Sequence, residues 1–459
     1  MKRILVIFLI TTMIFSLQTG CSDDHGLDPK EPVTLTLWHN YGGQMKETMD
    51  SMVDQFNESQ GKEKGIIINV TSISSSNALH EKLAMIANGD AGAPEMPDIT
   101  TANPKTAVML AEKDLLVNLK DQFSEKELKA YIPRFIEEGT LGTDQLYIFP
   151  TAKSTEVTFL NKTVFDRFSN ETGADYEDLS TFEGLAETAS LYYDWTDAQT
   201  PDIPNDGKTF YHSDSLFNFT QVGCRQLGSD FVNQDRLDYS SDAFRKVWSL
   251  FFNSAIQSHF AVFDGYASDL FKTGEIICST GSTAGVLFFD PVVTYADNTT
   301  ESVELMILPY PTFHGGEKTA MQRGSGMIVA KSGKAKEYAA SIFLKWFTSP
   351  ENNLRFVSST GYLPVTEEAF GDIMTEEIAS IPDKNIQSLL RTSIKMQADY
   401  DFYIPPLFDG IDELQDDYNT KLMNAAADTR KEYQGFHADS EKETIFQEAT
   451  DRGFDQFVQ

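Results

Sequence analysis

The chain has 459 residues, 41% of them hydrophobic and 12% aromatic, an ordinary globular composition with enough length for two or more domains. Its 69 acidic residues against 37 basic residues give a formal net charge of −32. This charge favours solubility and argues against nucleic acid or anionic lipid as a partner.

The first twenty residues are typical of a secretory signal peptide. Lys2 and Arg3 precede an apolar run over 4–17, which is too short to cross a bilayer as a permanent helix. The next four residues, QTGC, resemble the lipobox of bacterial lipoproteins, although Gln18 stands where leucine is usual. We therefore expect a signal peptide over 1–20, lipidation at Cys21 and a polar tether over 21–32. The alternative for Cys21 is a disulfide.

The two other cysteines, Cys224 and Cys278, either pair in an export compartment or remain buried free thiols, and the sequence leaves both open. There is no CxxC or HExxH motif, and the seven histidines are scattered. We expect no metal site and no cofactor.

The mature chain opens with a strand, a helix and a second strand. Val33–Trp38 alternates as a strand, and a helical stripe of methionines ends at Phe56, with Gly61 beyond the end of the helix. Ile66–Ile73 is almost continuously apolar, which predicts a strand covered on both faces.

The same alternation continues to residue 112. It indicates a second helix through Leu79 and Leu83, a short strand over 97–100 and a third helix over 106–112. This order predicts an α/β layer, in which ligands gather at the carboxyl ends of the strands. The side chains expected at that edge are Trp38, Asn40, Tyr41, Asn77 and Asn103.

Strands over 146–150 and 157–161 flank a polar insert. A helical pattern over 175–193 leads into a long loop over 194–214, which is rich in Asp, Pro, Gly and Thr and ends near Tyr211. Long loops in compact proteins are often functional.

A helix is expected over 243–255, a strand over 276–280 with a small-residue turn at 281–285, and another strand over 303–310. The segment 323–365 then combines a Gly-rich turn, a strand, a helix with one apolar face that must end before Pro350, and a TGYLP turn.

These motifs together, LWHNYGGQ, STGSTAG, RGSG and TGYLPV, resemble the extracellular solute-binding proteins of ABC importers, in the family that binds sugars and glycerol phosphates. The resemblance covers nearly the whole mature chain. It implies a periplasmic-binding-protein-like α/β fold with two discontinuous lobes and a ligand cleft at the hinge. The implied division is 33–152 plus 309–352 for one lobe and 153–308 plus 353–459 for the other.

A sugar needs aromatic platforms and a rim of fixed donors and acceptors. The expected ligand-binding residues combine both kinds: Trp38, Asn40, Tyr41, Asn77, Asn103, Tyr211, Ser282, Thr283, Gly324, Ser325, Tyr362 and Tyr403. Local turn chemistry is the competing interpretation, and for Asn77 and Asn103 it is the favoured one.

Catalysis has little support in the sequence. There is no GxSxG elbow and no complete phosphate-binding loop, and so many carboxylates make an Asp/Glu pair uninformative. The glycerol-3-phosphate-binding branch carries an arginine after a Pro-Pro segment, whereas here Pro405-Pro406 continues without one. A neutral carbohydrate is therefore the expected ligand, with a glycerol-3-phosphate or glycerophosphodiester as the alternative and a secreted glycosidase or an adhesion lipoprotein as rivals of other classes.

The family resemblance also implies partners and a location. We expect a monomer that delivers its ligand to ABC permease subunits and, through them, to a cytoplasmic ATPase. The protein should be exported and held by its lipid at the outer face of the bacterial cytoplasmic membrane, or lie in the periplasm.

Overall fold

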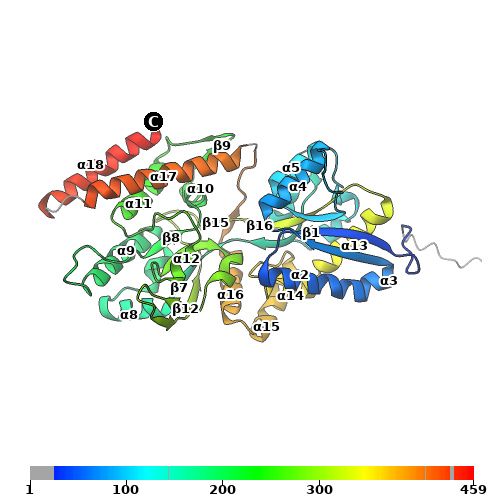
Figure 1. Cartoon of the computed structure of the whole chain (residues 1–459), viewed down its shortest axis with the longest axis horizontal. Helices are drawn as coiled ribbons and strands as arrows, with labels where there is room; N and C mark the ends of the chain where they lie inside the picture. Colours follow the sequence, from blue (N-terminus) through cyan, green and yellow to red (C-terminus); the bar gives the residue numbers. More distant parts are fainter. Residues whose placement is uncertain (1–24, 143, 409, 435–438) are drawn as a thin grey trace, which may run out of the picture.

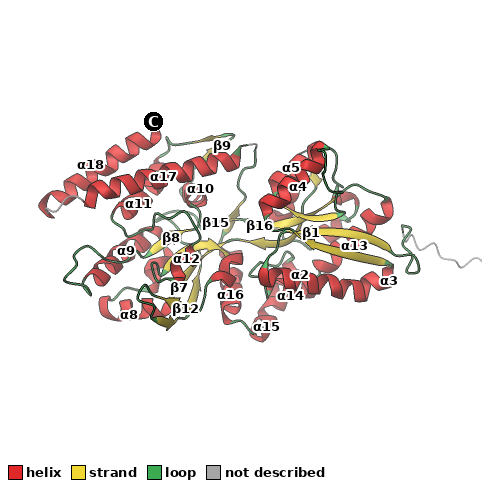
Figure 2. Cartoon of the chain, viewed as in Figure 1, coloured by secondary structure: helices red, strands yellow, loops and turns green. Residues whose placement is uncertain are grey.

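The computed structural model of the chain describes residues 25–142, 144–408, 410–434 and 439–459, with the side chains of Ser325, Gln434 and 439–445 excluded. The predicted signal peptide and Cys21 lie outside the described residues. Two β-sheets, each covered by helices, form two lobes side by side (Figures 1 and 2). The two-lobed α/β fold predicted from the sequence is confirmed.

The first lobe is built on a five-stranded sheet. Its strand order is β2 (Ile66–Ser72), β1 (Val33–His39), β3 (Ile99–Ala102), β16 (Arg323–Val329) and β6 (Phe149–Ser154). β1 runs parallel to β2 and β3, whereas β16 is antiparallel to both of its neighbours. The carboxyl ends of β1, β2, β3 and β6 therefore meet at the edge that faces the second lobe.

Helices cover both faces of this sheet. On one face, α4 (Ser76–Asn88) and α5 (Pro104–Glu112) enclose a small core around Leu83 and Leu110. On the other face, α2 (Gly43–Phe56) meets α13 (Lys334–Phe347), where Phe56 and Phe343 lie 5.2 Å apart. Further α-helical segments of this lobe are α3 (Lys62–Lys64), α6 (Glu125–Leu128), α7 (Pro133–Gly139), α14 (Pro350–Val357) and α15 (Met374–Glu377). A short hairpin joins β4 (Thr140–Leu141) to β5 (Gln145–Leu146).

Two local predictions in this lobe are wrong. β2 is an edge strand with alternating burial, and Ile67 is 40% exposed, so its apolar run is covered on one face only. α2 itself ends at Phe56, but Gly61 lies within a longer helical segment and not beyond it, because a π-helical turn over Asn57–Gly61 carries that segment into α3. The segment ends at Gly65, whose φ of +77° is the left-handed conformation that glycine adopts readily.

The second lobe is built on a four-stranded sheet. Its order is β14 (Leu305–Leu308), β7 (Glu156–Asn161), β11 (Cys278–Ser282) and β8 (Tyr211–Ser213). The helices around it are α8 (Lys162–Thr172), α9 (Phe182–Asp197), α10 (Leu216–Gln226), α11 (Asp242–Ile256), α12 (Ala267–Lys272) and α16 (Lys384–Asp399). Two hairpins join β9 (Val232–Asn233) to β10 (Arg236–Leu237) and β12 (Val292–Thr294) to β13 (Thr300–Ser302).

The last two helices lie on the second lobe. α17 (Ile411–Gln434) packs against α11, and α18 (Asp439–Val458) packs beside α17 (Figure 1). Asp412 and Glu413 lie in the first turn of α17. Within the described residues, no group of three or more His, Cys, Asp or Glu side chains is placed to hold a metal ion.

The first two crossings between the lobes lie later in the chain than expected. β6 continues to Ser154, so the first crossing is at Thr155 and not at Lys153. The second crossing also comes late, because Tyr310 and Phe313 still pack on Phe182 of the second lobe at 5.5 and 4.9 Å. The first lobe resumes near Arg323, after β15 (Thr319–Met321) has paired in parallel with β17 (Asp401–Tyr403).

The predicted return to the second lobe at residue 353 is wrong. The Asn353 amide donates to the carbonyl of Thr151 in the first sheet at 2.9 Å, and Leu363 forms a bridge with Lys153. The apolar face of α14 is buried in the first lobe's core, with Phe356 5.5 Å from Tyr41. The third crossing therefore lies between α15 and α16.

Cys224 and Cys278 are both free and buried. Burial raises the pKa of the Cys224 thiol to about 12, so it stays protonated and packs as a small apolar group. Of the two possibilities that the sequence leaves open, the structure shows free thiols. No helix among the described residues is long and apolar enough to cross a membrane.

Candidate functional site

The candidate site is the place where three chain segments meet between the lobes. Thr155, at the first crossing, donates its hydroxyl to the carbonyl of Met321 at 2.9 Å. The carbonyl of Thr155 accepts from the N–H of Thr283 at 2.8 Å. The strands of the crossing are thus tied together, and the side chains on either side of Thr155 are held in fixed positions.

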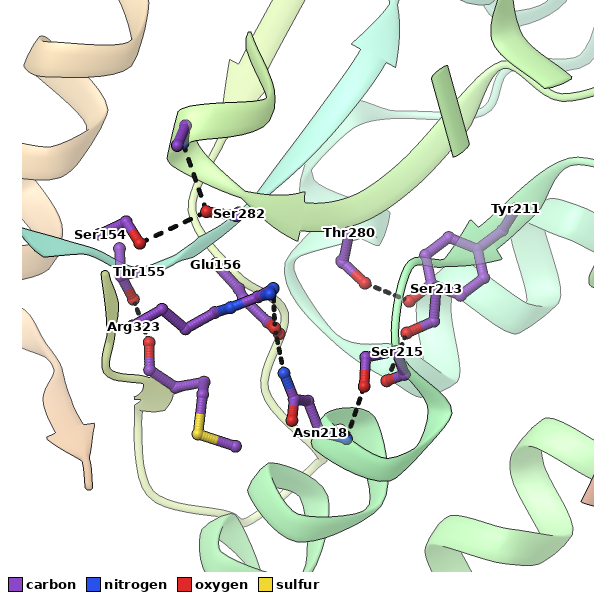
Figure 3. A network of polar contacts seen from close by, with 12 residues as sticks. Ser154, Thr155, Glu156, Tyr211, Ser213, Ser215, Asn218, Thr280, Ser282 and Arg323 are labelled. Atoms are coloured by element: carbon purple, nitrogen blue, oxygen red, sulfur yellow. Dashed lines mark hydrogen bonds and ion pairs between the residues drawn. The ribbon is translucent and has the colours of Figure 1, made fainter. Parts of the chain in front are cut away.

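An ion pair between a buried carboxylate and a partly exposed guanidinium lies at this junction (Figure 3). Glu156 opens β7 and is 5% exposed, and its Oε1 is 3.1 Å from the Arg323 guanidinium on β16. The Asn218 amide on α10 donates to the same oxygen at 2.9 Å. Burial raises the pKa of the Glu156 carboxyl, and Arg323 and Asn218 oppose that shift. A carboxyl, a guanidinium and an amide therefore converge between the lobes.

A second acidic group lies beside this pair. Asp214 accepts from the N–H of Ala267 at 2.7 Å, and burial raises the pKa of its carboxyl. Gly281 lies close to this carboxyl, because an added Cβ would be 2.3 Å from Asp214 Oδ2. Close by, the Ser282 hydroxyl of the second lobe lies 3.4 Å from the Ser154 hydroxyl of the first lobe (Figure 3).

Aromatic side chains cluster on the first-lobe side. Tyr362 lies 6.0 Å from Tyr41 and stacks at 6.3 Å on Phe356. Burial raises the pKa of the Tyr362 hydroxyl, and the field of Arg323 opposes the shift. The turn at Gly361, with φ of +74°, lies close to the second lobe, since a Cβ there would be 2.8 Å from the carbonyl oxygen of Thr283.

A buried ion pair lies near the end of β6. The Lys153 ammonium is 2.7 Å from the Glu138 carboxylate, and these side chains are 4% and 11% exposed. Lys153 also lies over the ring of Phe135 at 5.9 Å. The charge on Lys153 is therefore already balanced by a partner in the same lobe.

The lobes also contact each other through an ion pair that is separate from the junction of the crossing strands. Lys105, at the start of α5, forms an ion pair of 2.7 Å with Asp412 in the first turn of α17. Lys105 belongs to the first lobe and Asp412 to the second, so this contact spans the space between them. Both side chains are partly solvated, at 29% and 63% exposure.

Several of the predicted site residues lie at the junction of the crossing strands, around Glu156 and Arg323. Tyr362, Ser282 and Gly324 surround the Glu156–Arg323 pair, and Thr283 is there but fully buried. The backbone of Ser325 pairs with Ala152 in the same region, while its side chain lies outside the described set. Tyr41 is 3% exposed, and its ring packs edge-on against the ring of Tyr362.

Other predicted residues lie nearby in structural roles. Trp38, at the end of β1, packs half-buried on the small core beneath α4 and α5. Asn40 accepts from the Thr101 hydroxyl at 3.0 Å, and Asn103 accepts from the N–H of Thr106 at 2.9 Å as the N-cap of α5. Asn77 is exposed in the first turn of α4. Local turn chemistry, the favoured interpretation for Asn103, matches its observed contact.

The two remaining aromatic residues of the predicted site, Tyr211 and Tyr403, lie in different surroundings. Tyr211 is fully buried in the second lobe, where its hydroxyl is 2.6 Å from that of Thr280, and its ring packs on Phe260. The prediction that Tyr211 contacts ligand is wrong, because the core covers the whole side chain. Tyr403, on β17, lies in a hollow of about 600 Å³ where the guanidinium of Arg225 is 6.0 Å from its ring centroid.

The sequence analysis missed the charged residues of the site. Glu156 and Asn218 carry no local motif that marks them, Arg323 opens the RGSG motif but only its Gly324 and Ser325 were expected at the site, and Lys105 and Asp412 look like ordinary surface charges. One available signal was that Glu156 begins an otherwise apolar strand, where an unpaired charge would be costly to bury.

The sequence profile of the bacterial extracellular solute-binding proteins matches residues 51–382 of this chain. The chain belongs to this family. Among curated protein sequences, none matches this chain significantly.

Solved structures with the same fold come from several bacteria. The cyclic alpha-maltosyl-1,6-maltose binding protein of Arthrobacter globiformis is 18% identical with a TM-score of 0.68, and covers 93% of this chain and 100% of its own. UgpB of Mycobacterium tuberculosis, solved with glycerophosphocholine, is 16% identical with a TM-score of 0.66, and covers 93% and 100%. An ABC substrate-binding protein of Listeria monocytogenes, solved with cycloalternan, is 18% identical with a TM-score of 0.64, and covers 93% and 99%.

Proposed function

We propose that this protein captures a carbohydrate between its lobes and delivers it to the membrane permease of an ABC importer. The observation that carries the proposal is the junction of Glu156, Arg323 and Asn218 beside Tyr362, contributed by both lobes. Carboxyl, guanidinium and amide groups satisfy sugar hydroxyls, and an aromatic ring covers the apolar face of a sugar. Two of the similar structures, those from Arthrobacter and Listeria, are of an oligosaccharide-binding protein and an oligosaccharide complex.

The alternative ligand is a glycerol-3-phosphate or a glycerophosphodiester, which the UgpB complex favours. The charge pattern argues against it. Lys105, Lys153 and Arg323 each already pair with a carboxylate. A phosphate would compete with Asp412, Glu138 or Glu156 for these cations, and a neutral sugar would not.

Delivery depends on closure of the lobes over the ligand. A ligand that contacts both lobes binds the closed form more tightly, and this difference in affinity shifts the population toward that form. The permease would recognise the closed form. We propose that the protein acts as an exported monomer, anchored through a lipid on Cys21, and that it performs no catalysis.

Thermal-shift screening tests the ligand class. A panel of neutral mono- and oligosaccharides, together with glycerol-3-phosphate and glycerophosphocholine, is added to the purified protein. A ligand at a hundred times its Kd should add about 2.7 kcal/mol to the free energy of unfolding. A shift with sugars alone supports the proposal, and a shift with the glycerol phosphates alone supports the alternative.

Two further measurements separate the rivals of other classes. Turnover of a bound oligosaccharide, followed by chromatography of the mixture, would show a glycosidase and overturn the proposal. The absence of binding to every small ligand, together with binding to cell-surface material, would show an adhesion protein instead.

A further inference from the structure

A separate pocket lies in the second lobe, at the end of β7 that points away from the junction. β7 begins at Glu156, beside Arg323, and ends at Asn161, which lines the pocket. Six residues of extended chain span roughly 17 Å, so this pocket and the candidate site are distinct places. The pocket has a volume of about 370 Å³, and the proposed transport function makes no use of it.

Aromatic rings form much of its wall. Tyr192 and Trp195 lie on α9 with ring centroids 5.7 Å apart, and the Trp195 indole N–H donates to Glu171 at 2.8 Å. Tyr295, in the turn of the β12–β13 hairpin, donates its hydroxyl to Glu301 at 2.6 Å. Its ring lies directly on Gly274, where an added Cβ would be 2.6 Å from Cε1. The Trp195 and Tyr295 rings are therefore held in place before any ligand arrives.

Some of the charged side chains that line the pocket have ion-pair or hydrogen-bond partners, whereas one has no salt bridge among the described residues. Arg167 binds Glu301 through two contacts of 2.6 and 3.1 Å, and the Thr200 hydroxyl donates to Asp206. In contrast, the Lys208 ammonium lies 5.2 Å from the ring centroid of Tyr295 and makes no salt bridge within the described part of the chain.

The long loop that follows α9 supplies part of this wall. Thr200, Asp206 and Lys208 all belong to the loop over 194–214 that the sequence marks as long and polar. The Tyr193 hydroxyl donates to the carbonyl of Asn205 at 2.8 Å, and the N–H of Lys208 donates to Thr196 at 2.7 Å. The loop is therefore anchored to α9 at both places, and this anchoring fixes the position of the Lys208 backbone.

We propose that this pocket binds a small hydroxyl-rich ring that carries an anionic group, namely a sugar carboxylate or a sugar phosphate. The ring would lie against Trp195 and Tyr295, and the anionic group would meet the ammonium of Lys208. The carboxylates of Glu301 and Asp206 retain oxygen lone pairs that can accept from sugar hydroxyls. The site would act independently of transport through the cleft.

Tryptophan fluorescence and calorimetry test this proposal with defined probes. The protein is titrated with glucuronate, with glucose 6-phosphate and with glucose. We expect a saturable change in fluorescence with at least one of the two anions, and an affinity for glucose that is weaker by about tenfold or more. The stronger of the two anions identifies the carboxylate or the phosphate as the preferred group.

Three variants locate the site. Lys208→Ala should weaken anion binding by about tenfold, while Lys272→Ala, at an exposed lysine outside the pocket, should leave it unchanged. Trp195→Phe should abolish the fluorescence change and also weaken the binding measured by calorimetry, because the ligand ring lies against this side chain. Three results would overturn the proposal: no binding of either anion, unchanged affinity in Lys208→Ala, or loss of anion binding in Tyr362→Ala, which would place the anion in the cleft.

Discussion

At the scale of single residues, the most unusual feature is a carboxyl that is buried and yet shared between the lobes. Glu156 has one guanidinium and one amide as partners, from β16 and from α10. Burying such a group costs more than its pairing returns unless each partner is well placed. We propose that this arrangement serves binding, since the same three groups can satisfy the hydroxyls of a polar ligand.

Tyr362 gives the most direct test of the candidate site. Tyr362→Ala removes the ring that lies beside Arg323, and we expect ligand affinity to fall by roughly tenfold or more, measured by calorimetry with the sugar found in the screen. Tyr147→Ala, in the same lobe but away from the junction, is the matched control. Equal affinity in both variants would remove Tyr362 from the site.

Trp38→Ala is a weaker test than Tyr362→Ala, although the sequence marks both residues. The Trp38 ring packs on the small core under α4 and α5, so its removal also costs stability. Its effect on binding must therefore be compared with its effect on unfolding in the same preparation.

His212 predicts how stability depends on pH. The side chain is 3% exposed, and burial lowers its pKa to about 4. Below the ordinary value near 6.5, the unfolded chain takes up a proton that the folded chain cannot hold until about pH 4. The resulting stability is present above pH 6.5 and is lost as the pH falls toward 4, by up to about 3 kcal/mol.

The measurement is urea unfolding between pH 7.5 and 4. His212→Gln should reduce this loss, while His314→Gln, at an exposed histidine, should retain it. Burial also lowers the pKa of His259 to about 4, so part of the loss remains in the first variant. The same pH dependence in His212→Gln and in the wild type would contradict the assignment.

At the scale of elements, the junction depends on a close approach between β16 and β6. Gly324 has φ of +95°, and an added Cβ would lie 2.5 Å from the carbonyl oxygen of Ala152. Both the conformation and the contact exclude a side chain. The strand register that places Arg323 beside Ser154 therefore requires glycine at this position.

Gly324→Ala should lower the free energy of unfolding by about 2 kcal/mol or more, because it combines left-handed strain with a backbone clash. Gly285→Ala, where nothing lies within 4 Å of an added Cβ, is the matched control. Chemical denaturation of both variants measures the difference. Equal stability would show that β6 and β16 can separate without cost.

At the scale of the whole molecule, the Lys105–Asp412 pair joins the lobes at a point remote from the crossing strands. Since the pair is partly solvated, its contribution should be small and sensitive to salt. It stabilises only arrangements in which α5 and α17 are close. Its removal should therefore act on lobe closure and not on folding.

Asp412→Asn should weaken ligand binding by about fivefold at most, and the difference should vanish near 1 M salt. Asp428→Asn breaks an exposed pair with Lys431 inside α17 and is the control. Calorimetry at two salt concentrations, with small-angle scattering to follow closure, makes the comparison. The same affinity in Asp412→Asn and in the wild type at low salt would show that this contact plays no part in closure.

Much of this architecture could be predicted from the sequence. The alternation from Val33 to Glu112 predicts strands and helices that the structure confirms, because side-chain periodicity is a local property. Gly65 shows the limit of that approach, since a π-helical turn moves the end of the helix by several residues. Whether β2 is an edge strand depends on its neighbours, which no local pattern contains.

The strand and helix patterns of the sequence predicted an α/β layer, because these patterns are local, and the family resemblance implied the two lobes and led us to expect Tyr362 and Ser282 at the site. The tertiary structure alone decided that Glu156 meets Arg323, 167 positions away, and that Lys105 meets Asp412, 307 positions away. It also decided that Tyr211 is enclosed by the second core. Such pairings depend on how distant segments stack and cross, and the free energy that selects them appears only when the lobes are assembled.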